Sequence, residues 1–119
     1  MSGTSLDGLD MAVCEFEKDH GRWSYRLLHT RFREYPPDMR TRLEQAINYP
    51  SAELLAFHGA YGQWLGTRAA GMLEETGSTV DAIASHGHTI HHRPEHGFTF
   101  QLGSPQQVAL VTGCQTVGD

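Results

Sequence analysis

The sequence has no long apolar run and no leader in which charged residues precede an apolar stretch, which argues against membrane insertion and export. It also has no run of basic residues, and its formal net charge is -5, so nucleic acid is not an expected partner. The only cysteines, Cys14 and Cys114, lie in apolar, strand-like stretches. This pattern favours two buried free thiols over a disulfide, and we expect a cytoplasmic protein.

Internal repeats, linkers and low-complexity tracts are absent as well, so the 119 residues are expected to form one domain or part of one. The alternation of apolar and polar residues predicts a hairpin of two strands over residues 9–17 and 23–30. A short helix over 37–48 and a long helix from Ser51, as its cap, to about Gly77 should follow. Further strands are predicted over 80–85, 98–101 and 114–118, and a helix over 105–112. The long helix carries an aromatic stripe at helical spacing, which indicates core packing.

The opening stretch, residues 2–10, is the most distinctive polar segment of the chain. It reads S-G-T-S-L-D-G-L-D and leads into the apolar run at residues 11–14. Backbone amides and hydroxyls in such a loop can hold phosphate oxygens, and an acid at its edge can hold magnesium through water. The pattern matches neither of the common glycine-rich phosphate motifs, and composition alone favours a plain turn.

The opening stretch closely resembles the amino-terminal signature of the anhydro-N-acetylmuramic acid kinases. Residues 84–94, A-S-H-G-H-T-I-H-H-R-P, are similar to the family's S-H-G-Q-T-I-x-H-x-P segment. Residues 101–105, 112–113 and 117–119 are similar to the segment that follows it. The three matches occur in order along the chain, but members of the family are several times longer. The chain is therefore identified as the amino-terminal portion, residues 1–119, of a sugar-kinase domain.

The resemblance implies an α/β fold, namely part of an actin-like or hexokinase-like (ribonuclease H-like) ATPase domain with a mixed sheet and flanking helices. In that architecture the phosphate loop joins the first two strands. Met1 lies inside the signature, so the first strand is expected to be missing, which would expose a sheet edge and favour self-association. A homodimer is one assembly that such self-association would give.

The implied function is an ATP-dependent kinase that opens the 1,6-anhydro bridge of the amino sugar and phosphorylates O6, giving N-acetylmuramic acid 6-phosphate in peptidoglycan recycling. The expected small-molecule partners are ATP, Mg²⁺ and the amino sugar. The catalytic base should lie beyond Asp119, so this portion is expected to be inactive alone. The resemblance assigns to ATP the residues Gly3, Thr4, Ser5, Leu6, Asp7, Gly8, Leu9 and Asp10.

Within that loop, Asp7 or Asp10 would address Mg²⁺ through water, while Leu6 and Leu9 would pack. The resemblance places Ser85, His86, Gly87 and Thr89 on the amino-sugar side of the cleft. His88 stands where the family usually has Gln. For His91 and His92 two roles remain open, a contact with the sugar or a structural turn before Pro94.

A zinc site is the alternative interpretation of the histidine segment. His86, His88 and His91 have the spacing of the H-x-H-x-D-H motif of metallo-β-lactamase-like hydrolases, and three imidazoles can bind zinc. However, Ile90 stands where that motif has Asp, and the opening loop would then have no role. The kinase interpretation accounts for both regions.

Overall fold

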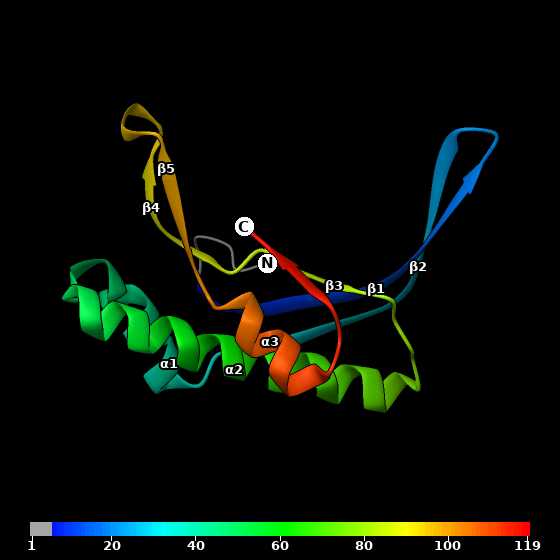
Figure 1. Cartoon of the computed structure of the whole chain (residues 1–119). Coiled ribbons are helices and arrows are strands. Elements are labelled where there is room, and N and C mark those ends of the chain that lie inside the picture. The colour runs from blue at the N-terminus through cyan, green and yellow to red at the C-terminus, as the bar shows by residue number, and fades with distance from the viewer. Residues whose placement is uncertain (1–5) are drawn as a thin grey trace.

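The computed structural model describes residues 6–119 and has an α/β architecture (Figure 1). Residues 1–5, which include the predicted ATP contacts Gly3, Thr4 and Ser5, lie outside the described part. The elements, in chain order, are β1 (Gly8–Asp19), β2 (Arg22–Glu34), α1 (Pro37–Gln45), η1 (Ala46–Asn48), α2 (Ser51–Thr76), β3 (Ile83–Ser85), β4 (His88–Arg93), η2 (Pro94–His96), β5 (Phe98–Leu102), α3 (Pro105–Thr112) and β6 (Thr116–Gly118).

The predicted strands and helices occur in the predicted order, but β4 was not predicted, and the strands do not form one mixed sheet. Hydrogen bonds among residues 6–119 define three two-stranded sheets: antiparallel β1–β2, parallel β3–β6 and antiparallel β4–β5. The β3–β6 ladder is only three residues long, and Gly87, at φ 72°, turns the chain into β4 directly after it. The β4–β5 hairpin then rises away from the helices (Figure 1). The strand predicted over 80–85 is thus shorter in the structure and begins only at Ile83. The interpretation of His91 and His92 as a turn is wrong, since β4 continues to Arg93.

The buried core joins α2 to both ends of the chain. Phe57 and Tyr61 of α2 are fully buried, and Leu65 is 6% exposed, which confirms that the aromatic stripe packs inside. The Tyr61 hydroxyl lies 2.7 Å from the Tyr35 hydroxyl, so these two buried polar groups satisfy each other. The same cluster includes Leu9 from β1, Leu43 from α1, Ile90 from β4, and Leu102 and Val108 from the β5–α3 region.

The helix ends follow the expected signals with one exception. Gly77 ends α2 in the left-handed conformation, and its amide donates to Glu74 and Leu73 carbonyls. Ser51, predicted as the cap of α2, is instead its first helical residue, and Pro50 occupies the cap position. Proline suits this position because the amide hydrogen that it lacks would have no partner within the helix, and because its fixed φ is compatible with the start of a helix. At α3, by contrast, the Ser104 side chain accepts a hydrogen bond from the Gln107 amide.

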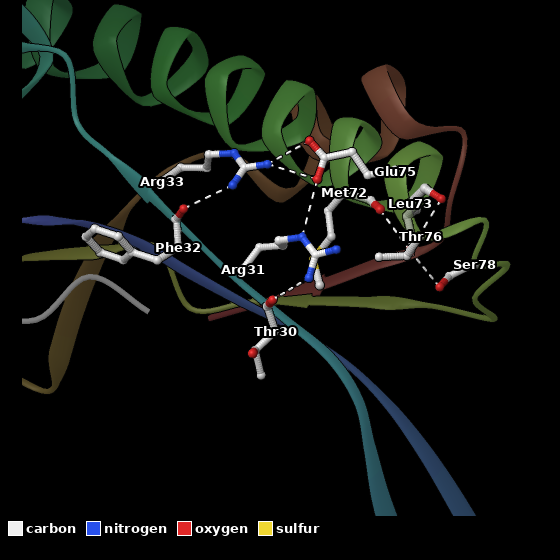
Figure 2. Close-up of polar contacts among 9 residues, drawn as sticks. All are labelled: Thr30, Arg31, Phe32, Arg33, Met72, Leu73, Glu75, Thr76 and Ser78. Atoms are coloured by element: carbon white, nitrogen blue, oxygen red, sulfur yellow. Dashed lines mark hydrogen bonds and ion pairs between the residues drawn. The ribbon is translucent and has the colours of Figure 1, made fainter.

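An ion-pair cluster fixes the end of α2 to β2 (Figure 2). The Arg33 guanidinium donates to both carboxylate oxygens of Glu75, at 2.7 and 2.9 Å, and Arg31 donates to one of them at 3.3 Å. The hydrogen bond from Arg33 lowers the pKa of Glu75, and the Coulombic attraction of both arginines adds to this effect. The pair is exposed, so it orients the helix end more than it stabilises the fold.

The two cysteines are free, as predicted, but the prediction that both are buried is wrong. Cys14 is exposed and Cys114 is partly exposed. A register shift between Val13 and Cys14 carries β1 off the core, so residues beyond it lie on a projecting hairpin (Figure 1). None of the helices within residues 6–119 is long and apolar enough to cross a membrane.

Candidate functional site

The described part of the opening segment packs its apolar residues and exposes its acids. Leu9 is 8% exposed within the core, and Leu6 packs against the same cluster from the left-handed region, at φ 52°. Asp7 is exposed, and its carbonyl oxygen accepts from the Tyr35 amide at 3.2 Å. The prediction that Leu6 and Leu9 pack is therefore confirmed, and the segment is held to the body by its backbone.

Gly8 has a structural reason to be glycine. A Cβ atom there would lie 2.3 Å from the Arg33 carbonyl oxygen and 2.7 Å from the Phe32 ring. The close approach of β1 to β2 therefore requires glycine at this position, whether or not a phosphate also approaches it. From the sequence, this glycine was expected to serve a turn or the approach of a phosphate, and its contact with β2 was not predicted.

Asp7 directly precedes β1 and Asp10 is its third residue, and both are exposed. Asp7 lines a shallow hollow together with Phe32, Glu34, Tyr35 and Arg40. Asp10 is exposed and lies opposite Phe32 in the ladder. Both acids thus lie near Phe32 at the start of β1, and carboxylate oxygens of this kind suit magnesium.

The histidine segment begins where two parallel strands end together. Ser85, the last residue of β3, pairs with Gly118, the last residue of β6. The next residue, His86, places its Nε2 atom 4.0 Å from a carboxylate oxygen of Asp119. Ligands of open α/β sheets bind beyond the carboxyl ends of the strands, and Ser85, His86 and Asp119 all lie at that edge.

Gln101 of β5 joins the histidine segment from the other side. Its Nε2 atom lies 3.3 Å from His86 Nε2, and its Oε1 atom is buried with no hydrogen-bond partner among residues 6–119. Thr89 lies directly opposite Gln101 in the β4–β5 ladder, so both side chains stand on one face of that hairpin. Ser85, His86, Thr89 and Gln101 thus form a polar group around the turn at Gly87.

Gly87 makes this turn through its backbone geometry. Its φ is 72°, and a Cβ atom would lie 2.3 Å from the Leu102 carbonyl oxygen. The turn is consequently pressed against the end of β5, and the residue is buried. Burial also lowers the pKa of His88, the next residue, so this imidazole is held in its neutral form.

His58, on α2, connects the core to this region and was not predicted to take part in it. Its Nδ1 atom accepts a hydrogen bond from the Gly103 amide at 3.0 Å, and its carbonyl oxygen accepts from the Ser104 amide at 3.0 Å. Its ring also packs 5.4 Å, centroid to centroid, from Phe100. The helical periodicity marked His58 only as one more residue on the inner face, so no local signal revealed this role.

We expect replacing His58 by Asn to flatten the dependence of stability on pH. Burial lowers the pKa of His58 below its ordinary value of 6.5, because the charged form loses water. Its contribution is therefore fully present above pH 6.5 and is lost as the pH falls through the lowered pKa. Asn keeps an acceptor near the Nδ1 position but does not titrate. Urea unfolding at several values between pH 5 and 7.5 measures this effect.

The control for this experiment is His96→Asn, at an exposed position in η2. We expect it to retain the steeper pH dependence of the parent chain, in which His88 also contributes with the same sign. Equal pH profiles for both variants would show that His58 does not titrate with folding.

The zinc alternative has no support in this geometry. No group of three His, Cys, Asp or Glu side chains within residues 6–119 is placed to hold a metal ion. His86 instead lies beside Gln101, while a register shift between Thr89 and His91 changes the direction of the following residues. His92 hydrogen-bonds to Thr99, with 2.9 Å between Nδ1 and Oγ1. The histidines have the spacing of a zinc motif in the sequence, but their side chains do not converge on one point.

Comparison with known proteins gives a consistent result along the whole chain. The family model described as anhydro-N-acetylmuramic acid kinase matches residues 1–119. Proteins named anhydro-N-acetylmuramic acid kinase are 38% identical to the chain in Pseudomonas putida, over 125 aligned residues, and 37% identical in both Synechococcus elongatus and Thiobacillus denitrificans. Each alignment covers 100% of this chain but only 32–33% of the relative. The chain spans about a third of the length of these curated relatives.

Proposed function

The chain belongs to the anhydro-N-acetylmuramic acid kinase family, and from this we propose that the complete protein phosphorylates 1,6-anhydro-N-acetylmuramic acid with ATP in the cytoplasm. The observation that carries the proposal is the match over all 119 residues, which includes both the opening segment and the histidine segment. Kinase activity in this family implies ATP and the sugar as substrates. The product would be N-acetylmuramic acid 6-phosphate, an intermediate of peptidoglycan recycling.

The proposed reaction couples hydrolysis of the anhydro bridge to phosphoryl transfer. Water attacks the anomeric carbon as the bond from that carbon to O6 breaks. O6 then bonds to the γ-phosphorus of ATP as the bond from that phosphorus to ADP breaks, and ADP leaves. The proton of the attacking water must pass to a base. We place that base beyond Asp119. Within this chain, Asp119 lies beside His86 at the strand ends and would help to shape the sugar side of the site.

On the phosphate side, we propose that Gly3, Thr4, Ser5 and the backbone through Asp10 surround the β- and γ-phosphates of ATP. Asp7 would hold Mg²⁺ through water, since it lines the hollow at the start of β1 and carboxylate oxygens suit this ion. When bound, magnesium would neutralise phosphate charge as it develops during transfer. Leu6 and Leu9 serve this loop by fixing it to the core.

On the sugar side, we propose that Ser85, His86 and Thr89 hydrogen-bond to hydroxyl, acetamido or lactyl oxygens. Gly87 allows the turn that places them together, and its packing against β5 keeps the group rigid. The buried Oε1 atom of Gln101 adds an acceptor to the same group. A neutral polar lining of this kind suits a sugar, whose groups are mostly uncharged hydroxyls.

The complete protein, incubated with ATP, magnesium and the anhydro sugar, should give N-acetylmuramic acid 6-phosphate, detected by mass spectrometry. N-acetylglucosamine and glucose serve as comparison substrates and should give little phosphate transfer. If the protein phosphorylated ordinary hexoses and ignored the anhydro sugar, the substrate assignment would be wrong.

We expect the 119-residue chain alone to show no multiple turnover under the same conditions. It covers about a third of its relatives and, in our proposal, lacks the base that takes the proton from water. Cleft closure, which excludes bulk water from the reaction, also needs a second lobe. Clear turnover that is abolished by Asp119→Asn would contradict this expectation and would make Asp119 the base.

A further inference from the structure

The corner between β5 and α3, residues 103–104, joins the two sides of the polar group at the strand ends. On its β5 side, the Leu102 carbonyl oxygen lies against Gly87, where a Cβ atom would be 2.3 Å from that oxygen. The preceding residue, Gln101, places its side-chain amide 3.3 Å from His86. The position of the corner therefore affects where this side of the polar group lies.

On its α3 side, the corner leads into Pro105, which lies against the end of β6. A Cβ atom on Gly118 would overlap the Pro105 ring, so the two residues are in close contact. Gly118 pairs with Ser85 in the parallel ladder, and Asp119 follows it directly. A shift of the corner would consequently displace the turn at Gly87 and the end of β6 together.

His58 fastens the corner to α2 through two hydrogen bonds. Its Nδ1 atom accepts from the Gly103 amide at 3.0 Å, and its carbonyl oxygen accepts from the Ser104 amide at 3.0 Å. A backbone amide can only donate, so Nδ1 carries no proton and the neutral ring has its proton on Nε2. Burial, which lowers the pKa of His58, favours this neutral form. The first of the two bonds depends on the side chain, whereas the second does not.

The corner lies directly on α2, so its backbone has little freedom to rearrange. Gly103 is buried at φ 111°, and a Cβ atom there would lie 2.9 Å from Leu65 and 3.1 Å from Tyr61. Without the acceptor that His58 provides, the Gly103 amide would be a buried donor with no partner. Such a donor loses its hydration without gaining a hydrogen bond, so the corner would have to move to regain one.

We propose, on the basis of the function proposed above, that His58 is a positioning residue for the sugar. Its effect is indirect, because Nδ1 is occupied by the corner, and it acts by holding the turn at Gly87 and the end of β6 in place. Ser85, His86 and Thr89 are then ordered before the sugar arrives, which lowers the entropic cost of binding. The opening segment lies at the start of β1, so the binding of ATP should depend little on His58.

Steady-state kinetics of the complete protein with two substitutions of His58 tests this role. Leucine has no acceptor for the Gly103 amide, whereas asparagine offers its Oδ1 atom near the position of Nδ1. We expect His58→Leu to lower kcat/KM for the anhydro sugar about tenfold or more and to leave the KM for ATP within about twofold. His58→Asn should recover most of the loss, because it restores the hydrogen bond without the imidazole ring.

Met72→Ala, on the same helix, controls for a general loss of stability. The Met72 side chain is 4% exposed, so its truncation also weakens packing. It lies near the end of α2 that contacts β2 (Figure 2), away from the corner. We expect this variant to be less stable than the parent protein and to keep kcat/KM for the sugar within about twofold.

Amide hydrogen exchange of the parent protein gives a second measurement that needs no variant. If the sugar binds best when the corner is in place, binding must stabilise the corner in turn. Exchange of the Gly103 and Ser104 amides should slow about fivefold or more when the anhydro sugar is added without ATP. The Gly77 amide, at the end of α2, is the control and should change less than about twofold.

Unchanged sugar kinetics in His58→Leu would overturn the positioning role, and so would equal losses in His58→Leu and His58→Asn or unchanged exchange at the corner. A loss in Met72→Ala as large as that in His58→Leu would overturn it as well, since any weakening of α2 would then suffice. A parent protein that transfers no phosphate to the anhydro sugar would contradict the proposed function, and the role of His58 with it. That result is distinct, because it is seen before any variant is compared.

Discussion

Replacing Phe57 by alanine is expected to lower the free energy of unfolding of the chain by about 3–5 kcal/mol, because truncating a buried Phe leaves a cavity that its neighbours do not fill. Phe57 is fully buried, with the rings of Tyr49 and Tyr61 at 6.0 and 6.1 Å. The Arg42 guanidinium also lies 4.1 Å from the centre of its ring. A loss of this size is a large part of the total stability of a small domain, which is about 5–15 kcal/mol.

Urea denaturation followed by circular dichroism measures this loss. The control is Leu55→Ala on the same helix, where the side chain is 62% exposed and little apolar area is lost. We expect that control to change stability by about 0.5 kcal/mol or less. Similar losses for Phe57→Ala and Leu55→Ala would contradict the position of α2 in the core.

Replacing Gly87 by alanine is expected to cost about 2–4 kcal/mol and to disturb the polar group at the strand ends. One part of the cost is the positive φ of 72°, which is worth about 1–2 kcal/mol for a residue with a Cβ atom. The other part is steric, since the new Cβ atom would lie 2.3 Å from the Leu102 carbonyl oxygen. A backbone atom cannot move aside as a flexible side chain can, so the turn and β5 must separate.

Gly97 provides the matched control for this substitution. Its φ is 78°, but a Cβ atom there would meet no atom of the described part of the chain within 4 Å. Gly97→Ala should therefore show the conformational cost alone, about 1–2 kcal/mol. The difference between the two variants, measured by thermal unfolding, isolates the steric part. If Gly87→Ala is no worse than Gly97→Ala, the turn is not pressed against β5.

Local sequence signals predicted most of the helices and strands. The alternation of apolar and polar residues around Gly21 identified the β1–β2 hairpin, and the helical spacing from Leu54 to Met72 identified α2 and its buried face. These signals succeed because each arises from residues close together in sequence. Pro37 and Gly77 marked helix ends for the same reason, since each restricts or permits specific backbone angles.

Contacts between residues far apart in the chain could not be predicted from the sequence. The hydrogen bond from Gly103 to His58 joins residues 45 positions apart, and neither residue has a neighbour that indicates it. The exposure of Cys14 depends on a register shift that no motif announces. For the candidate site, motif resemblance predicted Ser85, His86, Gly87 and Thr89, and the structure places Gln101 and Asp119 beside His86.

The central claim is that this chain supplies an ATP side at the opening segment and a sugar side at the histidine segment of an anhydro-sugar kinase. Steady-state kinetics of the complete protein with Asp7→Asn and Thr89→Val, with both substrates varied, tests it most directly. We predict that Asp7→Asn raises the KM for ATP and magnesium about tenfold or more and leaves the KM for the sugar nearly unchanged. Thr89→Val should raise the KM for the sugar and leave the KM for ATP nearly unchanged. Each substitution removes a hydrogen bond to one ligand only, so it weakens the binding of that ligand alone. Unchanged constants in both variants, or effects on the opposite substrates, would contradict the assignment.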